Sequence, residues 1–85
     1  MYKVIITRRV DKELATLTRS ERSSVLDKLK SLDFPFPVNF DIKKMINAPG
    51  LYRLRVGKIR IIFEILQNAH EIWIRKIGHR GNIYD

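Results

Sequence analysis

The clearest pattern in the chain is an alternation of apolar and polar residues over residues 51–65, interrupted once by Gly57 and Lys58. Alternation on both sides of a short glycine-containing segment is typical of two antiparallel strands joined by a two-residue turn. With Gly57 and Lys58 as the turn, Val56 pairs with Ile59, and every other pair of the hairpin follows from this register.

A second alternating segment, residues 71–77, follows a turn near residues 67–70 and extends the hairpin into three strands. The predicted pairs across this turn are Ile65 with Ile72, Phe63 with Ile74, and Glu64 with Trp73. One face of the sheet is then continuously apolar, which suits packing against helices. This face consists of Tyr52, Leu54, Val56, Ile59, Ile61, Phe63, Ile65, Ile72 and Ile74.

The opposite face of the predicted sheet carries basic side chains. The alternation assigns to it Arg53, Arg55, Arg60, Trp73, Arg75 and Ile77. In this register Arg55 lies directly opposite Arg60, and two like charges facing each other across a ladder are destabilising. We therefore interpret the three hairpin arginines as a site for a polyanion. Arg75 is diagonal to Glu64, and we expect these two side chains to form an ion pair.

Helical periodicity fills much of the N-terminal half. Thr7 can cap a first helix, and Thr18 with Glu21 matches the capping box of a second. The apolar stripes of these helices are Val10, Leu14 and Leu17 in the first, and Val25, Leu26, Leu29 and Leu32 in the second. The two prolines in residues 34–37 end the second helix, because proline lacks a backbone donor and restricts the residue before it.

The remaining segments complete an α+β fold in one domain, residues 1–85. Residues 2–6 alternate like a strand, and residues 38–50 read as irregular chain. Four apolar side chains are expected to pin the irregular chain to the core: Phe40, Ile42, Met45 and Ile46. We expect a twisted antiparallel sheet of about four strands, with an N-terminal helical hairpin on one face and a basic concave face opposite.

Charge and composition narrow the choice of partners. The net charge is +8, and residues 43–85 hold nine basic and three acidic side chains, hence +6 of that total. A basic excess concentrated on strands favours a nucleic acid or an acidic protein as partner. With no cysteine and two isolated histidines, we expect no metal site and no cofactor. No apolar run approaches a membrane span, so we expect a soluble cytoplasmic protein without a membrane partner.

Two motifs resemble those of a known family. The run Pro49-Gly-Leu-Tyr-Arg-Leu-Arg-Val-Gly-Lys-Ile-Arg60 and the end Gly78-His-Arg-Gly-Asn-Ile-Tyr84 are similar to the RelE/ParE superfamily of toxin–antitoxin toxins, in particular its RelE branch. The similarity covers essentially the whole chain, because that family also begins with a short strand and two helices.

The resemblance implies the toxin of a type II toxin–antitoxin system. RelE-like toxins enter the A site of the small ribosomal subunit and cut the bound mRNA without a metal. The ribose 2′-hydroxyl attacks the adjacent phosphate and leaves a 2′,3′-cyclic phosphate. The implied partners are the ribosome with its mRNA and an acidic RelB-like antitoxin, with DNA contacted only through the antitoxin.

The resemblance also implies the site residues of this chain. They are Arg53, Arg55, Arg60, Arg80 and Tyr84, with His79 as a further candidate acid or base. Tyr84 is either the general base or a side chain that stacks on an RNA base. Arg53 and Arg55 stand where some members carry lysine, and arginine cannot act as a base because its pKa exceeds about 12.

Two other functions fit the same pattern. One is the ParE-like branch, which inhibits DNA gyrase and lacks this set of arginines. The other is a noncatalytic RNA-binding module that uses the same charges without cleavage. The arginines together with Tyr84 favour the RelE branch.

Overall fold

Two helices and five strands make up the computed structural model, which describes residues 1–79. The elements are β1 (Lys3–Ile6), α1 (Arg8–Ala15), α2 (Arg19–Ser31), β2 (Asp41–Lys44), β3 (Leu51–Val56), β4 (Ile59–Leu66), the single 3-10 turn η1 (Gln67–Ala69) and β5 (Glu71–His79). Neither helix of this part of the chain is long and apolar enough to cross a membrane.

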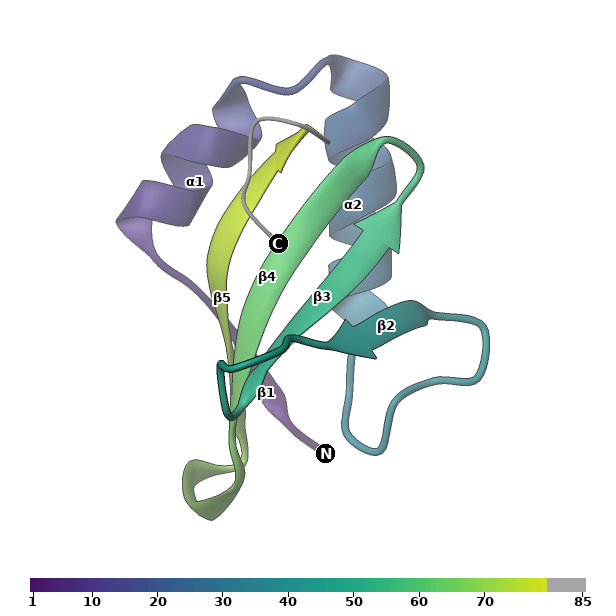
Figure 1. The fold of residues 1–85 in the computed structure, drawn as a ribbon. Coiled ribbons are helices and arrows are strands. Elements are labelled where there is room, and N and C mark those ends of the chain that lie inside the picture. Colours follow the sequence, from purple (N-terminus) through teal and green to yellow (C-terminus); the bar gives the residue numbers. More distant parts are fainter. Residues whose placement is uncertain (80–85) are drawn as a thin grey trace.

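All five strands belong to one sheet in the order β1-β5-β4-β3-β2 (Figure 1). Neighbouring strands are antiparallel except β1 and β5, which are parallel. The helices pack on the sheet through α1 with β5 and α2 with β3. The α+β architecture with an N-terminal helical hairpin is therefore confirmed.

The register predicted for the central hairpin is confirmed throughout. Val56 pairs with Ile59, and Arg55 lies opposite Arg60. Gly57 adopts a φ of 59°, a left-handed conformation that favours glycine in a two-residue turn. The three pairs predicted across the second turn are also present: Ile65 with Ile72, Glu64 with Trp73, and Phe63 with Ile74.

A β-bulge beyond these pairs corrects one prediction. The register between β4 and β5 shifts between Ile62 and Phe63, so Arg75 is an extra residue on β5. From the bulge onward each β5 side chain changes face, and Ile77 pairs with Ile61 in the core at 3% exposure. The assignment of Ile77 to the arginine face was wrong for this reason.

The segment 38–50 was also predicted incorrectly in part. Its residues 41–44 form β2, a fifth strand that pairs with β3 at the edge of the sheet. Phe40 and Ile42 pack against the core as expected, whereas Ile46 is 88% exposed. Ile42 is the residue of β2 that packs against the core, and its neighbours are charged, as is typical of edge strands. One apolar residue is too few to show the alternation by which a strand is recognised in a sequence.

Both predicted helix caps are present. Thr7 Oγ1 accepts a hydrogen bond from the Val10 amide at 3.2 Å. Thr18 and Glu21 close the capping box, with distances of 2.9 Å and 3.1 Å between side-chain oxygen and amide nitrogen. The core between helices and sheet joins the predicted stripes: Val10, Leu14, Leu17, Val25, Leu29, Leu32, Leu54, Ile59, Ile61, Phe63, Ile65, Ile72, Ile74 and Ile77.

Candidate nucleic-acid interface

The face of the sheet turned away from the helices brings the predicted hairpin arginines together. Paired residues of neighbouring strands share a face, so the pairing gives two adjacent rows. The first row consists of Asp41, Arg55, Arg60 and Gly78. The second row, beside the first, consists of Lys43, Arg53, Ile62 and Lys76. These rows hold five cations and one carboxylate. We call them the arginine face.

Two of its members were missed by sequence reasoning. Lys43 was hidden because β2 read as irregular chain, and Lys76 because the bulge reverses the faces of β5. The only sequence signal for Lys43 is the short charged segment around Ile42, which is too brief to set a register. Their positions extend the arginine face beyond the hairpin on both sides.

Burial separates this face from an ordinary solvated strand surface. Arg60 is only 7% exposed, and Arg53 and Arg55 are half-buried. The Nε atom of Arg55 is buried and makes no hydrogen bond within the part of the chain that the structure describes. A guanidinium keeps its charge at any ordinary pH, and a withdrawn charge is costly unless a ligand or neighbour compensates it. This arrangement is suited to an anionic ligand.

Arg75 has the role expected of it. Its Nε and Nη2 atoms donate to Glu64 Oε1 at 3.0 Å and 2.6 Å. The guanidinium also lies over the ring of Trp73, 5.0 Å from the ring centroid. The positive charge of Arg75 is therefore neutralised locally by Glu64.

His79 is separated from the arginine face. Opposite Ile59, it lies on the helix side of the sheet, where its Nε2 atom is 2.8 Å from Oε2 of Glu21 in α2. Hydrogen bonds from the Thr18 amide and from His79 hold the pKa of Glu21 below its usual value. Glu21 thus joins the end of β5 to the start of α2.

The other predicted residues, Arg80 and Tyr84, lie outside the described residues. Of the predicted site, the structure therefore brings together Arg53, Arg55 and Arg60, and directs His79 elsewhere. Within residues 1–79, no three His, Asp, Glu or Cys side chains gather in a way that could hold a metal ion.

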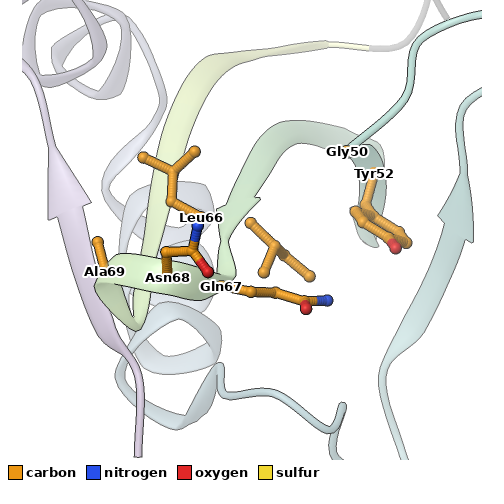
Figure 2. A pocket seen from close by; sticks show the side chains of 7 residues that line it. Gly50, Tyr52, Leu66, Gln67, Asn68 and Ala69 are labelled. Atoms are coloured by element: carbon orange, nitrogen blue, oxygen red, sulfur yellow. The ribbon is translucent and has the colours of Figure 1, made fainter.

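A cavity of about 450 Å³ lies at the other end of the sheet, beside η1 (Figure 2). Its lining has no charged side chain and consists of Gly50, Tyr52, Ile65, Leu66, Gln67, Asn68 and Ala69. Because it offers no cation to a phosphate, this cavity is distinct from the candidate interface.

Comparisons with known proteins agree with this architecture. Residues 4–84 match the family described as the ParE toxin of the type II toxin–antitoxin system parDE. The Methanocaldococcus jannaschii protein named RelE1 is 34% identical over 85 residues, which cover 98% of this chain and 94% of that protein.

Two solved structures extend the comparison. The archaeal RelE–RelB complex from Pyrococcus horikoshii OT3 matches with a TM-score of 0.80 and 30% identity, over 96% of this chain and 98% of that chain. The RelB–RelE complex from Methanococcus jannaschii matches with a TM-score of 0.74 and 25% identity, over 94% of each chain. The chain belongs to the RelE/ParE superfamily and is a RelE-like toxin of a toxin–antitoxin system.

Proposed function

We propose that this toxin is an endoribonuclease that cuts mRNA in the ribosomal A site. The observation that carries the proposal is an arginine pair: half-buried Arg55 lies opposite buried Arg60. Their face of the sheet is the one that no helix of residues 1–79 covers (Figure 1). Such a pair is unfavourable for folding and favourable for binding a phosphate.

The proposed reaction transfers a phosphoryl group within the RNA. The 2′-oxygen of one ribose attacks the adjacent phosphorus, the bond to the next 5′-oxygen breaks, and a 2′,3′-cyclic phosphate and a 5′-hydroxyl result. Negative charge grows on the phosphorus-bound oxygens in the transition state. Fixed guanidinium donors stabilise that charge, and each contributes about 10²–10³ in rate. We assign Arg60 and Arg80 to the closest contacts, with Arg53 and Arg55 beside them.

A proton must leave the 2′-hydroxyl and another must reach the 5′-oxygen. Arginine cannot accept the first proton, and we assign that step to Tyr84, whose pKa near 10 would be lowered by neighbouring cations. His79 is held by Glu21 on the helix side of the sheet, so we assign it to anchoring the end of β5 and not to proton transfer.

We propose that cleavage depends on the ribosome. A sheet surface can hold phosphates, but alignment of attacking oxygen, phosphorus and leaving oxygen requires the RNA backbone to be fixed as well. We propose that the ribosome supplies this alignment. Binding to RNA should weaken as salt rises, because the C-terminal half carries +6.

We further propose an acidic RelB-like antitoxin as the partner, since the two solved structures compared above are complexes of RelE with RelB. The surface of α2 offers a hollow of about 430 Å³ lined by Leu17, Arg19, Arg22, Ser23 and Leu26. This mixture of leucines and arginines suits an amphipathic acidic segment that folds on binding. DNA would be contacted only through the antitoxin.

The experiment that tests the proposed function compares three substrates. Purified toxin is incubated with mRNA on programmed ribosomes, with the same mRNA alone, and with DNA gyrase and relaxed plasmid. We expect cleavage within the A-site codon only on ribosomes, with products that end in a 2′,3′-cyclic phosphate. Inhibition of supercoiling without mRNA cleavage would support the ParE-like alternative, and ribosome binding without cleavage would support a noncatalytic module.

A further inference from the structure

The β-bulge in β5 builds a stacked pair of planar groups beside the arginine face. Trp73 pairs with Glu64 and therefore lies on the face turned away from the helices. The extra residue Arg75 is directed to the same face and covers the indole ring at 5.0 Å. Bulges commonly redirect one side chain at a functional surface. We call Trp73 and Arg75 the stacked pair.

Two carboxylates fix the edges of the stacked pair. Trp73 Nε1 donates to Glu71 Oε1 at 2.9 Å, and Arg75 donates twice to Glu64. The indole N–H and one edge of the guanidinium are thus occupied, and the charge of Arg75 is balanced. What this pair still offers to a ligand is a planar surface, since the Arg75 side chain is 41% exposed.

The position of the stacked pair relates it to the phosphate-binding cations. Glu64, beneath Arg75, is four residues from Arg60 along β4, which corresponds to about 13 Å at ~3.3 Å per residue. A short stretch of single-stranded RNA spans this distance. Unpaired bases are bound in proteins by stacking on aromatic rings and on guanidinium planes.

We propose that the stacked pair binds an unpaired nucleobase of the RNA whose phosphate lies on the arginine face. The inference rests on the proposed function, and it identifies a base-binding subsite next to the phosphate site. Because stacking is tolerant of sequence, this subsite holds the RNA in place without selecting one base.

The test measures RNA binding directly and needs neither cleavage nor a ribosome. The probe is a dye-labelled hexaribonucleotide with 2′-O-methyl riboses, which lacks the attacking hydroxyl, and a second hexamer of equal charge that lacks all bases. Trp73 is the only tryptophan, so quenching of its fluorescence reports contact with the bases. Fluorescence anisotropy gives the affinity of Trp73→Phe and Trp73→Leu.

We expect saturable quenching by the intact hexamer, retention of affinity in Trp73→Phe, and a roughly tenfold loss in Trp73→Leu. The loss should disappear with the hexamer that lacks bases. Arg75→Gln should weaken binding of the intact hexamer more than Arg9→Gln, a matched control that also removes one glutamate-paired arginine. Circular dichroism checks the folding of each variant.

Binding of the hexamer without quenching, no measurable binding, or equal loss with both hexamers would overturn the inference. These results are distinct from failure of the proposed function. Base-dependent coupling to Trp73 in a protein that cuts no mRNA on ribosomes would leave the subsite standing and remove the catalytic assignment.

Discussion

At the scale of single residues, Arg55 and Arg75 show the difference between an arginine that we assign to ligand binding and one that forms an internal ion pair. Arg75 is exposed and bonded to Glu64, as surface arginines usually are. Arg55 is half-buried, and its Nε atom has no hydrogen bond within residues 1–79. Since both side chains carry the same charge, the difference lies in their partners. We therefore propose that Arg55, and not Arg75, binds an external anion.

Replacement of Tyr84 by Phe separates proton transfer from stacking. The change removes the ionisable hydroxyl and keeps the aromatic ring. If Tyr84 is the base, the single-turnover rate on programmed ribosomes should fall by about 10²–10⁴, with ribosome affinity unchanged. Equal rates for the two proteins from pH 6 to pH 9 would instead assign Tyr84 to stacking.

The face and the pairing partner of a residue could be predicted from the sequence wherever the strand register continues without a bulge. The turn at Gly57 fixed the pair Arg55 and Arg60, and the next turn fixed the ion pair of Arg75 with Glu64. Ile77 could not be predicted, because a bulge depends on how two strands twist together and leaves no clear pattern in the sequence. The roles of Arg80 and Tyr84 stay predictions, since both lie outside the described residues.

At the scale of elements, two carboxylates fasten the two ends of α2 to the rest of the fold. Glu21 caps α2 and bonds to His79, while Asp33, just after α2, accepts hydrogen bonds from the amides of Tyr2 and Phe34 at 2.9 Å and 2.8 Å. The bonds from Tyr2 and Phe34 lower the pKa of Asp33, as those from Thr18 and His79 lower that of Glu21. Both groups therefore stabilise the fold in their charged form.

These lowered pKa values predict a loss of stability in acid. Folding favours the deprotonated carboxylates, so their stabilisation is complete above the ordinary values of 4.5 for Glu21 and 3.8 for Asp33. It decreases as the pH falls through the folded-state values below these. Urea unfolding measures the free energy of unfolding at pH 7 and at pH 3. The difference between these two free energies should be smaller in Glu21→Gln and Asp33→Asn than in the wild type.

Glutamine also forms the capping box and asparagine also accepts amide hydrogen bonds, so both variants should fold at pH 7. A pH dependence equal to that of the wild type would mean that these two carboxylates do not control acid stability.

The elements were predictable where local signals agreed with tertiary packing. Both helices begin at threonine caps and bury an apolar stripe against the sheet, and both the caps and the stripes can be recognised in the sequence. The strand β2 has four residues and one core contact through Ile42, so its formation depends on pairing with β3. Pairing of distant segments is not encoded in local periodicity.

At the scale of the whole molecule, we assign antitoxin binding and RNA binding to opposite sides of the sheet. Its helix side supplies the core and the surface that we assign to the antitoxin, and its other side carries the arginine face (Figure 1). Under this proposal the antitoxin binds without contacting the cations that we assign to catalysis.

This division predicts different effects of two sets of changes. Arg53→Glu with Arg55→Glu should abolish toxicity and weaken antitoxin binding less than Leu26→Ser in α2, which removes apolar contact at the proposed hollow. Titration calorimetry with the cognate antitoxin measures the binding affinity of both variants. Loss of the complex through the arginine reversals alone would mean that the antitoxin blocks the arginine face directly.

The most direct test of the central claim is single-turnover cleavage of mRNA on programmed ribosomes by Arg60→Gln, Arg80→Gln and the control Arg9→Gln. Each change removes one positive charge, and Arg9 lies on α1 away from the arginine face. With circular dichroism confirming the fold, we predict that the first two variants lose at least about a hundredfold in rate and that the control stays within about threefold of wild type. Near-wild-type rates for both Arg60→Gln and Arg80→Gln would contradict the account.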